Sequence, residues 1–384
     1  MSSVEIFVNP SAQAVVPLEV LGPRTREPWQ AHRSLPGYAP TDLRSLPELA
    51  RLLGVSDVLV KDESERLGLP SFKILGASWA SLTEVQRAWC PRSEEAVTLP
   101  SVLAGLDRVD GRGLVAATDG NHGRGVARMA ALLGLSATIL VPAGTAPSRI
   151  DAIASEGADV QVINGTYDDA IAVSAGLADD DHLVISDTSW EGYQDAPRAV
   201  INGYSTMFYE IDDAAATLHL PVPTVVALQA GVGAFAAAAL RHYRTGAAGQ
   251  PKTVLVEPSG ANCLQTSARA GAPTLVPGPH TSSMAGLNCG LPSELAWPTV
   301  LAGTDTFVAI PDAYTERAMR ALAEVGIVSG ESGAAGLAGL LALAESRDAA
   351  DLEQIGLTPQ SCVLVINTEG ATDPVNYRRV LAGA

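Results

Sequence analysis

An alternation of short apolar runs and helical patterns between residues 114 and 187 limits the possible folds more than any other feature. Runs that predict strands cover residues 114–117, 137–141, 160–163 and 183–186. Helical patterns over residues 123–134 and 148–156, and another from Tyr167, lie between them. Such a repeat requires right-handed crossovers between parallel strands. The sequence therefore predicts an α/β protein with a small lobe built on four parallel strands.

A second set of apolar runs predicts a larger parallel sheet. Its expected strands cover residues 58–61, 224–228, 253–256, 306–309 and 362–366. Long helices are expected between them, including residues 196–211, 314–325 and 334–344. We expect residues 1–85 and 196–384 to form a large domain and residues 86–195 a small one, as two lobes with a ligand cleft. One large doubly wound sheet would accommodate the same pattern.

Two regions lack a clear pattern of strands and helices. Prolines interrupt residues 1 to about 55, so we expect irregular structure there, with one short helix over residues 44–53. Residues 273–298 are rich in Gly, Pro, Ser and Asn, which predicts a long functional loop.

Charge and cysteine content exclude several classes of partner. The formal net charge of -17 argues against nucleic acid and against anionic membrane surfaces. With no long apolar run and no basic leader, we expect a soluble cytoplasmic protein. The four cysteines lack the spacing of metal ligands, so no metal is expected. Cys263 and Cys289 flank the predicted long loop, either as free buried thiols or as a disulfide that closes it.

Lys73 follows a polar loop and begins a new helical pattern. A desolvated lysine near a helix N-terminus has a lowered pKa, because burial and the helix dipole both disfavour its charge. The free amine can then form an imine with an aldehyde. A surface lysine at the end of a loop would give the same short pattern, so the assignment depends on the other motifs.

Three more motifs follow Lys73 in the chain. Residues 118–123 (Thr-Asp-Gly-Asn-His-Gly) and residues 230–234 (Ala-Gly-Val-Gly-Ala) each join a predicted strand to a helix, and residues 367–370 (Asn-Thr-Glu-Gly) end the last strand. Glycines let several backbone amides approach an anion at a helix N-terminus. No Walker lysine or serine accompanies them, which argues against a nucleoside triphosphate.

Taken together and in order, these motifs resemble those of the fold-type II pyridoxal-phosphate enzymes, the tryptophan synthase β and threonine dehydratase group. Within that group the chain is most similar to the diaminopropionate ammonia-lyases, from about Lys61 to Tyr377. The resemblance implies two lobes, each with a mostly parallel sheet flanked by helices, and pyridoxal 5'-phosphate in the cleft between them. It also implies a homodimer and a small amino-acid substrate.

The resemblance implies a cofactor-binding role for eight residues. Lys73 would hold the cofactor and remove the Cα proton, Asn121 would contact its phenolic oxygen, and Thr368 its ring nitrogen. A hydroxyl protonates that nitrogen poorly, and a neutral ring favours elimination over transamination. The other five cofactor-binding residues are Phe72 and, in the glycine loop, Gly231, Val232, Gly233 and Ala234.

Substrate binding is implied for the loop after the first small-lobe strand and for one further carboxylate. The loop residues are Thr118, Asp119, Gly120 and His122. Asp119 would act as a base opposite Lys73, which would admit both D and L substrates. Asp187 begins an Asp-Thr-x-Trp-Glu-Gly-Tyr run and would pair with the β-ammonium of the substrate. If Asp119 and Asp187 share a site, their pKa values should separate.

The predicted reaction is therefore removal of ammonia from 2,3-diaminopropionate, which gives pyruvate and ammonia. One alternative is a serine or threonine dehydratase, or a β-replacement enzyme; Asp119 argues against a dehydratase, which carries a small hydroxyl residue there. Another is a cofactor-free binding protein, disfavoured because Lys73, Asn121 and the Gly231 loop are all present. The sequence leaves open the physiological substrate, the stereopreference, the oligomeric state and any monovalent-cation requirement.

Overall fold

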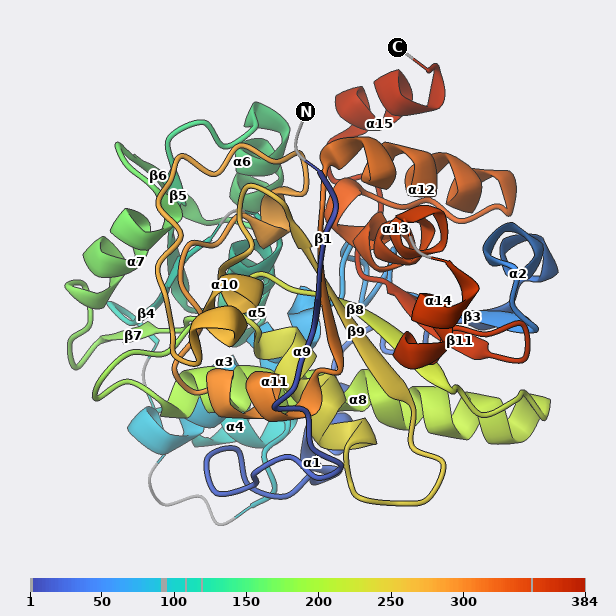
Figure 1. Ribbon diagram of the computed structural model, residues 1–384. Helices are drawn as coiled ribbons and strands as arrows, with labels where there is room; N and C mark the ends of the chain where they lie inside the picture. The colour runs from blue at the N-terminus through green and yellow to red at the C-terminus, as the bar shows by residue number, and fades with distance from the viewer. Residues whose placement is uncertain (1–2, 91–94, 108, 119, 347, 384) are drawn as a thin grey trace. The chain divides into compact units, whose positions relative to one another are not determined.

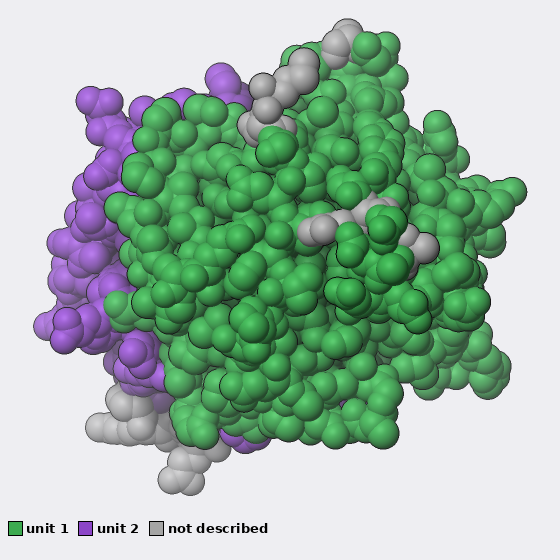
Figure 2. Space-filling view, viewed as in Figure 1, with its two compact units in different colours: residues 1–22, 40–65, 207–384 green, residues 23–39, 66–206 purple. Residues whose placement is uncertain are grey.

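The computed structural model describes residues 3–90, 95–107, 109–118, 120–346 and 348–383 (Figure 1). The chain divides into two compact units, each built from separate stretches of sequence (Figure 2). Unit 1 consists of Met1–Gly22, Pro40–Glu65 and Met207–Ala384, and unit 2 of Pro23–Ala39 and Arg66–Thr206. Helix α8 (Asp195–Leu218) begins in unit 2 and continues into unit 1.

Unit 2 contains a sheet of four parallel strands in the order β6-β5-β4-β7. Its strands are β4 (Gly113–Ala117), β5 (Ser136–Pro142), β6 (Asp159–Ile163) and β7 (His182–Val184). Its helices are α1 (Glu27–His32), α3 (Lys73–Trp89), α4 (Leu99–Gly105), α5 (Asn121–Leu133), α6 (Pro147–Ala154) and α7 (Tyr167–Ala175). The predicted four-stranded parallel lobe is confirmed.

Unit 1 contains a separate sheet of seven strands in the order β1-β10-β9-β8-β11-β3-β2. The five inner strands are parallel, and β1 and β2 add to the two edges in the antiparallel sense. The strands are β1 (Glu5–Val8), β2 (Leu43–Ser45), β3 (Asp57–Asp62), β8 (Val225–Gln229), β9 (Lys252–Pro258), β10 (Thr306–Ile310) and β11 (Cys362–Asn367). Two separate sheets rule out the single doubly wound sheet.

The helices of unit 1 cover this sheet, and one of them is almost entirely buried. Helix α13 (Glu331–Ser346) is buried from Glu331 to Leu343 and contacts β8, β9, β10 and β11, because its small and apolar residues leave no polar face. The other helices are α2 (Pro47–Leu53), α9 (Ala234–Tyr243), α10 (Cys263–Ala270), α11 (Trp297–Gly303), α12 (Asp312–Glu324), α14 (Ala349–Ile355), α15 (Pro374–Leu381) and the short 3-10 helix η1 (Ala285–Leu287). In the described part of the chain, no helix combines the length and apolar character that a membrane span needs.

The prediction of irregular structure near the N-terminus was wrong in three places. Strand β1 and helix α1 form there, and residues 43–53 are a short strand followed by a helix rather than one helix. Pro28 and Pro47 both lie in the first turn of their helices. Proline is tolerated at that position, since its missing N–H would have no partner in the helix.

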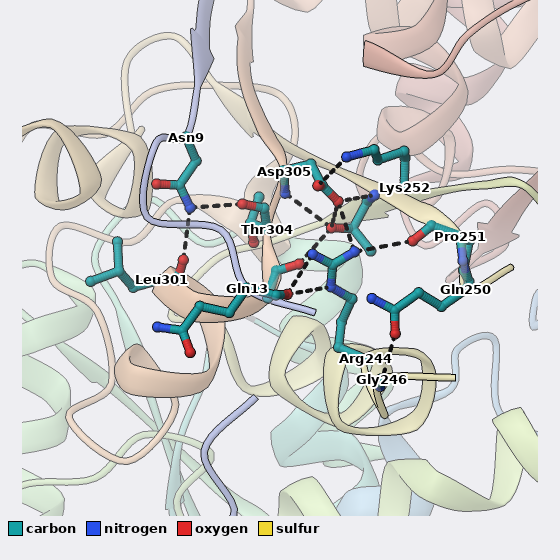
Figure 3. A network of polar contacts seen from close by, with 12 residues as sticks. Asn9, Gln13, Arg244, Gly246, Gln250, Pro251, Lys252, Leu301, Thr304 and Asp305 are labelled. Atoms are coloured by element: carbon teal, nitrogen blue, oxygen red, sulfur yellow. Dashed lines mark hydrogen bonds and ion pairs between the residues drawn. The ribbon is translucent and has the colours of Figure 1, made fainter. Parts of the chain in front are cut away.

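A buried arginine fixes the segment that follows β1 (Figure 3). Arg244 Nη2 donates to the Gln13 carbonyl at 2.6 Å, and Arg244 Nη1 lies 3.1 Å from Asp305 Oδ2. Lys252 Nζ donates to the other oxygen of Asp305 at 3.0 Å. The carboxylate therefore balances the buried guanidinium, and the N-terminal segment gains fixed partners although it has no regular structure.

Candidate active site

Lys73 is the first residue of α3, and its amine contacts a buried carboxylate. Lys73 Nζ lies 2.7 Å from Asp187 Oδ2, with 19% and 6% of the two side chains exposed. Both residues belong to unit 2. Of the three active-site side chains predicted as catalytic, the structure thus brings two into direct contact. The third, Asp119, lies outside the described residues.

The chain contains only two other lysines, Lys61 and Lys252. Lys61 is fully buried and paired with Glu210 at 2.9 Å. Lys252 is paired with Asp305 at the start of β9, in the network that fixes the N-terminal segment. Lys73 is therefore the lysine whose surroundings suit covalent chemistry.

Asp187 is held through both of its carboxylate oxygens. Tyr167, the first residue of α7, donates its hydroxyl to Asp187 Oδ1 at 2.8 Å. Burial by itself would raise the pKa of Asp187, but the charges of Lys73 and His122 and the hydrogen bonds from Lys73 and Tyr167 lower it well below its usual range. These contacts favour the carboxylate form of Asp187. The predicted separation of its pKa from that of Asp119 stays a prediction, because Asp119 lies outside the described residues.

The residues after Asp187 form a turn that Tyr193 closes. The Tyr193 hydroxyl donates to the Val184 carbonyl at 2.6 Å and accepts from the Ser186 amide at 3.1 Å. Its ring stacks on Trp190 with centroids 4.1 Å apart. The aromatic positions of the Asp-Thr-x-Trp-Glu-Gly-Tyr run therefore have a structural purpose, because they fix the backbone that carries Asp187.

The loop between β4 and α5 is pinned by a hydroxyl and an imidazole. Thr118 Oγ1 accepts hydrogen bonds from the amides of Gly120 and Gly123, both at 3.0 Å. His122 is buried, and its Nε2 donates to the Ile185 carbonyl at 2.8 Å, two residues before Asp187. Asn121 is the first residue of α5. The loop is therefore tied to the segment that carries Asp187, whereas its predicted contacts with a substrate remain predictions.

Phe72 precedes Lys73 and lies beside its amine. Its ring centroid is 4.7 Å from that of Tyr204, and Lys73 Nζ is 5.7 Å from the Phe72 ring. The packing of Phe72 against Tyr204 fixes the residue just before α3, and this limits where the Lys73 side chain can begin.

In unit 1 the glycine loop joins β8 to α9, and a side chain at either of its two glycines would be strained. A Cβ atom on Gly231 would lie 2.8 Å from Cys289 Sγ, and Gly233 has a φ of +99°. The first amides of a helix have no intrahelical acceptor and point toward its N-terminal end. Gly231, Val232, Gly233 and Ala234 therefore form a backbone cradle that suits a phosphate.

The predicted long loop packs against this cradle. A Cβ on Gly231 would also lie 3.2 Å from the Gly286 carbonyl, which belongs to η1 within the loop. The Gly286 amide donates to Ser332 Oγ at 3.1 Å, and Ser282 and Ser283 donate to Asp312 at 2.5 and 2.8 Å. The loop is thus fixed to the starts of α12 and α13.

Of the two possibilities for Cys263 and Cys289, free thiols or a disulfide, the structure shows free thiols. Cys263 and Cys289 are both buried free thiols, as are Cys90 and Cys362. Cys263 Sγ donates to the Gly231 carbonyl at 3.8 Å, and Cys289 Sγ also lies close to this glycine.

Thr368 follows β11 and is 4% exposed. Its hydroxyl accepts a hydrogen bond from Gln229 Nε2 at 2.8 Å. Sequence reasoning missed Gln229, as it missed Tyr167. Gln229 ends β8, the neighbour of β11, and the carboxyl ends of adjacent parallel strands converge, which was the available signal.

Comparison with known proteins gives one consistent result. A sequence model of the family described as "Pyridoxal-phosphate dependent enzyme" matches residues 35–358. Diaminopropionate ammonia-lyase of Salmonella typhimurium is 35% identical over 365 residues, which cover 91% of this chain and 90% of that protein. The Escherichia coli K12 protein of the same name is 37% identical over 362 residues, covering 92% and 89%. A crystal structure of holo diaminopropionate ammonia lyase from Escherichia coli superimposes with a TM-score of 0.90 at 33% identity, covering 99% of this chain and 96% of that one.

Proposed function

The chain belongs to the diaminopropionate ammonia-lyase family of fold-type II pyridoxal-phosphate-dependent enzymes, and we propose that it converts 2,3-diaminopropionate to pyruvate and ammonia. The assignment rests on nearly the whole chain. The two alignments each include about nine-tenths of this chain and about nine-tenths of the relative.

The residues present fit pyridoxal phosphate on two independent observations. In unit 2, Lys73 offers an amine for the cofactor aldehyde; in unit 1, the Gly231 cradle excludes a Cβ and presents amides to a phosphate. Bound pyridoxal phosphate supplies an electron sink for the carbon that loses its proton. Lys73 and Asp119 are the residues proposed to remove that proton, from opposite faces.

The observation that carries the choice of substrate is the contact between Asp187 and a cation. Asp187 is buried, ionised and already paired with the Lys73 ammonium at 2.7 Å. If Lys73 held the cofactor, it would no longer offer Asp187 a free ammonium group. Without the Lys73 charge, burial would raise the pKa of Asp187, so the carboxyl would either take up a proton or need another cation. A substrate that brings a cation of its own would keep Asp187 ionised, and we propose that the site selects such a substrate. Diaminopropionate carries a β-ammonium group, whereas serine and threonine carry a neutral hydroxyl.

Substrate choice is tested by a screen for pyruvate release from D- and L-diaminopropionate and D- and L-serine, and for 2-oxobutanoate release from L-threonine. We expect diaminopropionate to give the highest kcat/KM for at least one enantiomer. The matched control is Lys73→Ala, which should release no 2-oxo acid from any substrate. A higher kcat/KM for serine or threonine would make the protein a dehydratase.

We further propose that the enzyme acts in the cytoplasm as a homodimer. Four reduced cysteines support a reducing compartment. Sedimentation equilibrium of the holoenzyme tests the dimer, and a monomer would contradict it.

A further inference from the structure

We propose that Gln229 is a positioning residue that directs the proton of the Thr368 hydroxyl toward the ring nitrogen of the cofactor. The inference deepens the proposed function and rests on it. It starts from an arrangement of hydrogen bonds inside unit 1, at the ends of the adjacent strands β8 and β11.

The amide nitrogen of Gln229 is surrounded by acceptors. It lies 3.1 Å from the carbonyl oxygens of both Ser332 and Gly333, and 3.0 Å from that of Ile366. The fourth neighbour is Thr368 Oγ1, which is the nearest at 2.8 Å. Gln229 itself is only 2% exposed, so water does not compete for these positions.

These neighbours fix which end of the Gln229 amide faces Thr368. The three carbonyl oxygens can only accept hydrogen bonds. A flipped amide would place Gln229 Oε1 against three carbonyl oxygens, which repel it and have no proton to offer. In the orientation observed, Oε1 is buried without a hydrogen-bond partner among the described residues, but that repulsion is avoided. The nitrogen must therefore point at this cluster, and Gln229 can only donate to Thr368.

The direction of that bond decides what the threonine hydroxyl can do. A hydroxyl has one proton and accepts through its lone pairs. Because Thr368 Oγ1 accepts from Gln229, its proton stays available for a different partner. Among the described residues, that proton has the Ser332 carbonyl as an acceptor at 3.5 Å, far from the optimum of about 2.7–2.8 Å for a hydroxyl donor. An aromatic nitrogen is a better acceptor, and a hydroxyl donor leaves it neutral.

The consequence concerns the hydrogen bond that the cofactor ring nitrogen would accept. Without Gln229, the Thr368 hydroxyl can turn to the carbonyl oxygens that the amide now occupies, and the ring nitrogen then loses its donor. Gln229 acts through Thr368 in this account, so its effect must disappear when the Thr368 hydroxyl is absent.

The test compares Gln229→Met, which keeps the length of the side chain but has no donor, with Thr368→Val and with the double variant. The first measurement is the dissociation constant of pyridoxal phosphate from the apo-protein, followed by absorbance. Each single variant should bind about two- to tenfold more weakly, as expected for one hydrogen bond. The double variant should bind no more weakly than Thr368→Val.

The second measurement is the nitrogen-15 chemical shift of the ring nitrogen in protein loaded with labelled pyridoxal phosphate. In Gln229→Met and in Thr368→Val it should move toward the value of a neutral nitrogen without a hydrogen bond. Gln229→Glu is the conservative variant: a carboxyl among three carbonyl oxygens keeps its proton and can still donate, so the wild-type shift should return. Should Gln229→Met not fold, Gln229→Asn replaces it, because its shorter amide cannot reach Thr368.

Losses that multiply in the double variant, or a Gln229→Met shift equal to that of the wild type, would overturn the inference while leaving the proposed function intact. A wild-type protein that binds no pyridoxal phosphate would instead overturn the proposed function itself.

Discussion

Lys73 and Asp187 form an ion pair of 2.7 Å that joins the start of α3 to the segment after β7. The cofactor would bind to this same lysine. The β-ammonium of the substrate would then replace the Lys73 ammonium as the partner of Asp187. Burial would raise the pKa of Asp187, and the Lys73 charge opposes that effect. In the proposed reaction the β-ammonium of the substrate would take over this role of Lys73.

Lys73→Ala should abolish covalent attachment of pyridoxal phosphate, because the two other lysines are engaged elsewhere in unit 1. Borohydride reduction of the wild-type holoenzyme, followed by peptide mapping, should label Lys73 alone. Lys252→Arg, which keeps the charge beside Asp305, is the control and should retain the label. A label on Lys61 or Lys252 would contradict the assignment.

Asp187→Asn should reduce kcat/KM for diaminopropionate by about ten- to hundredfold, because hydrogen bonds to charged groups are typically worth 1.5–3 kcal/mol. Tyr167→Phe removes only one neutral donor to the same carboxylate, so its loss should be about fivefold. Steady-state kinetics with both variants check this order. Equal losses would mean that the charge of Asp187 does not contribute to binding.

Asp119→Asn should harm one enantiomer of diaminopropionate far more than the other. Asparagine keeps the size of aspartate but cannot accept a proton, and general-base catalysis is typically worth about 10²–10⁴-fold. Single-turnover rates with D- and L-diaminopropionate measure the difference, and the cofactor absorbance should be unchanged. Small and equal losses would leave Asp119 without a role as a base.

Glu257 should make the protein less stable as the pH rises from about 4.5 to 8. Burial raises the pKa of this carboxyl to about 8, and hydrogen bonds from the Leu264 and Gln265 amides, both 2.8 Å, offset only part of the effect. Between the two pKa values the unfolded chain has lost the proton and the folded protein keeps it. The free energy of unfolding should then fall by up to about 1.4 kcal/mol per pH unit from this group.

Glu257→Gln is the matched variant for this prediction, since it carries no titrating group. Urea unfolding at pH 5 and pH 8 should show the wild type losing stability relative to Glu257→Gln as the pH increases. A difference between the two proteins that does not change with pH would mean that Glu257 is ionised in the folded state.

Much of the fold and part of the site could be predicted from sequence, for identifiable physical reasons. Short apolar runs and turn glycines identify buried parallel strands, which is why all four strands around residues 114–187 were found. The edge strands β1 and β2 were missed because they are only four and three residues long, too short to show a clear period. Lys73 and the Gly231 loop have local signatures at helix starts.

Contacts between distant segments have no such local signature. Nothing near Tyr167 in the sequence points to Asp187, twenty residues away, until α7 and the end of β7 are placed in space. The sequence identifies Gln229 only as a residue at the end of a strand. Its proposed role depends on a hydrogen bond to Thr368, which is distant in the sequence. Whether Cys263 and Cys289 are bonded is likewise a question of distance rather than of spacing.

The ratio of ammonia to pyruvate released by the wild-type enzyme tests the central claim most directly. Elimination of the β-amine from diaminopropionate, followed by loss of the α-amine, must release two molecules of ammonia for each pyruvate. We predict this ratio with diaminopropionate, together with its loss in Lys73→Ala. Release of one ammonia per pyruvate, or no pyruvate from either enantiomer, would contradict the account.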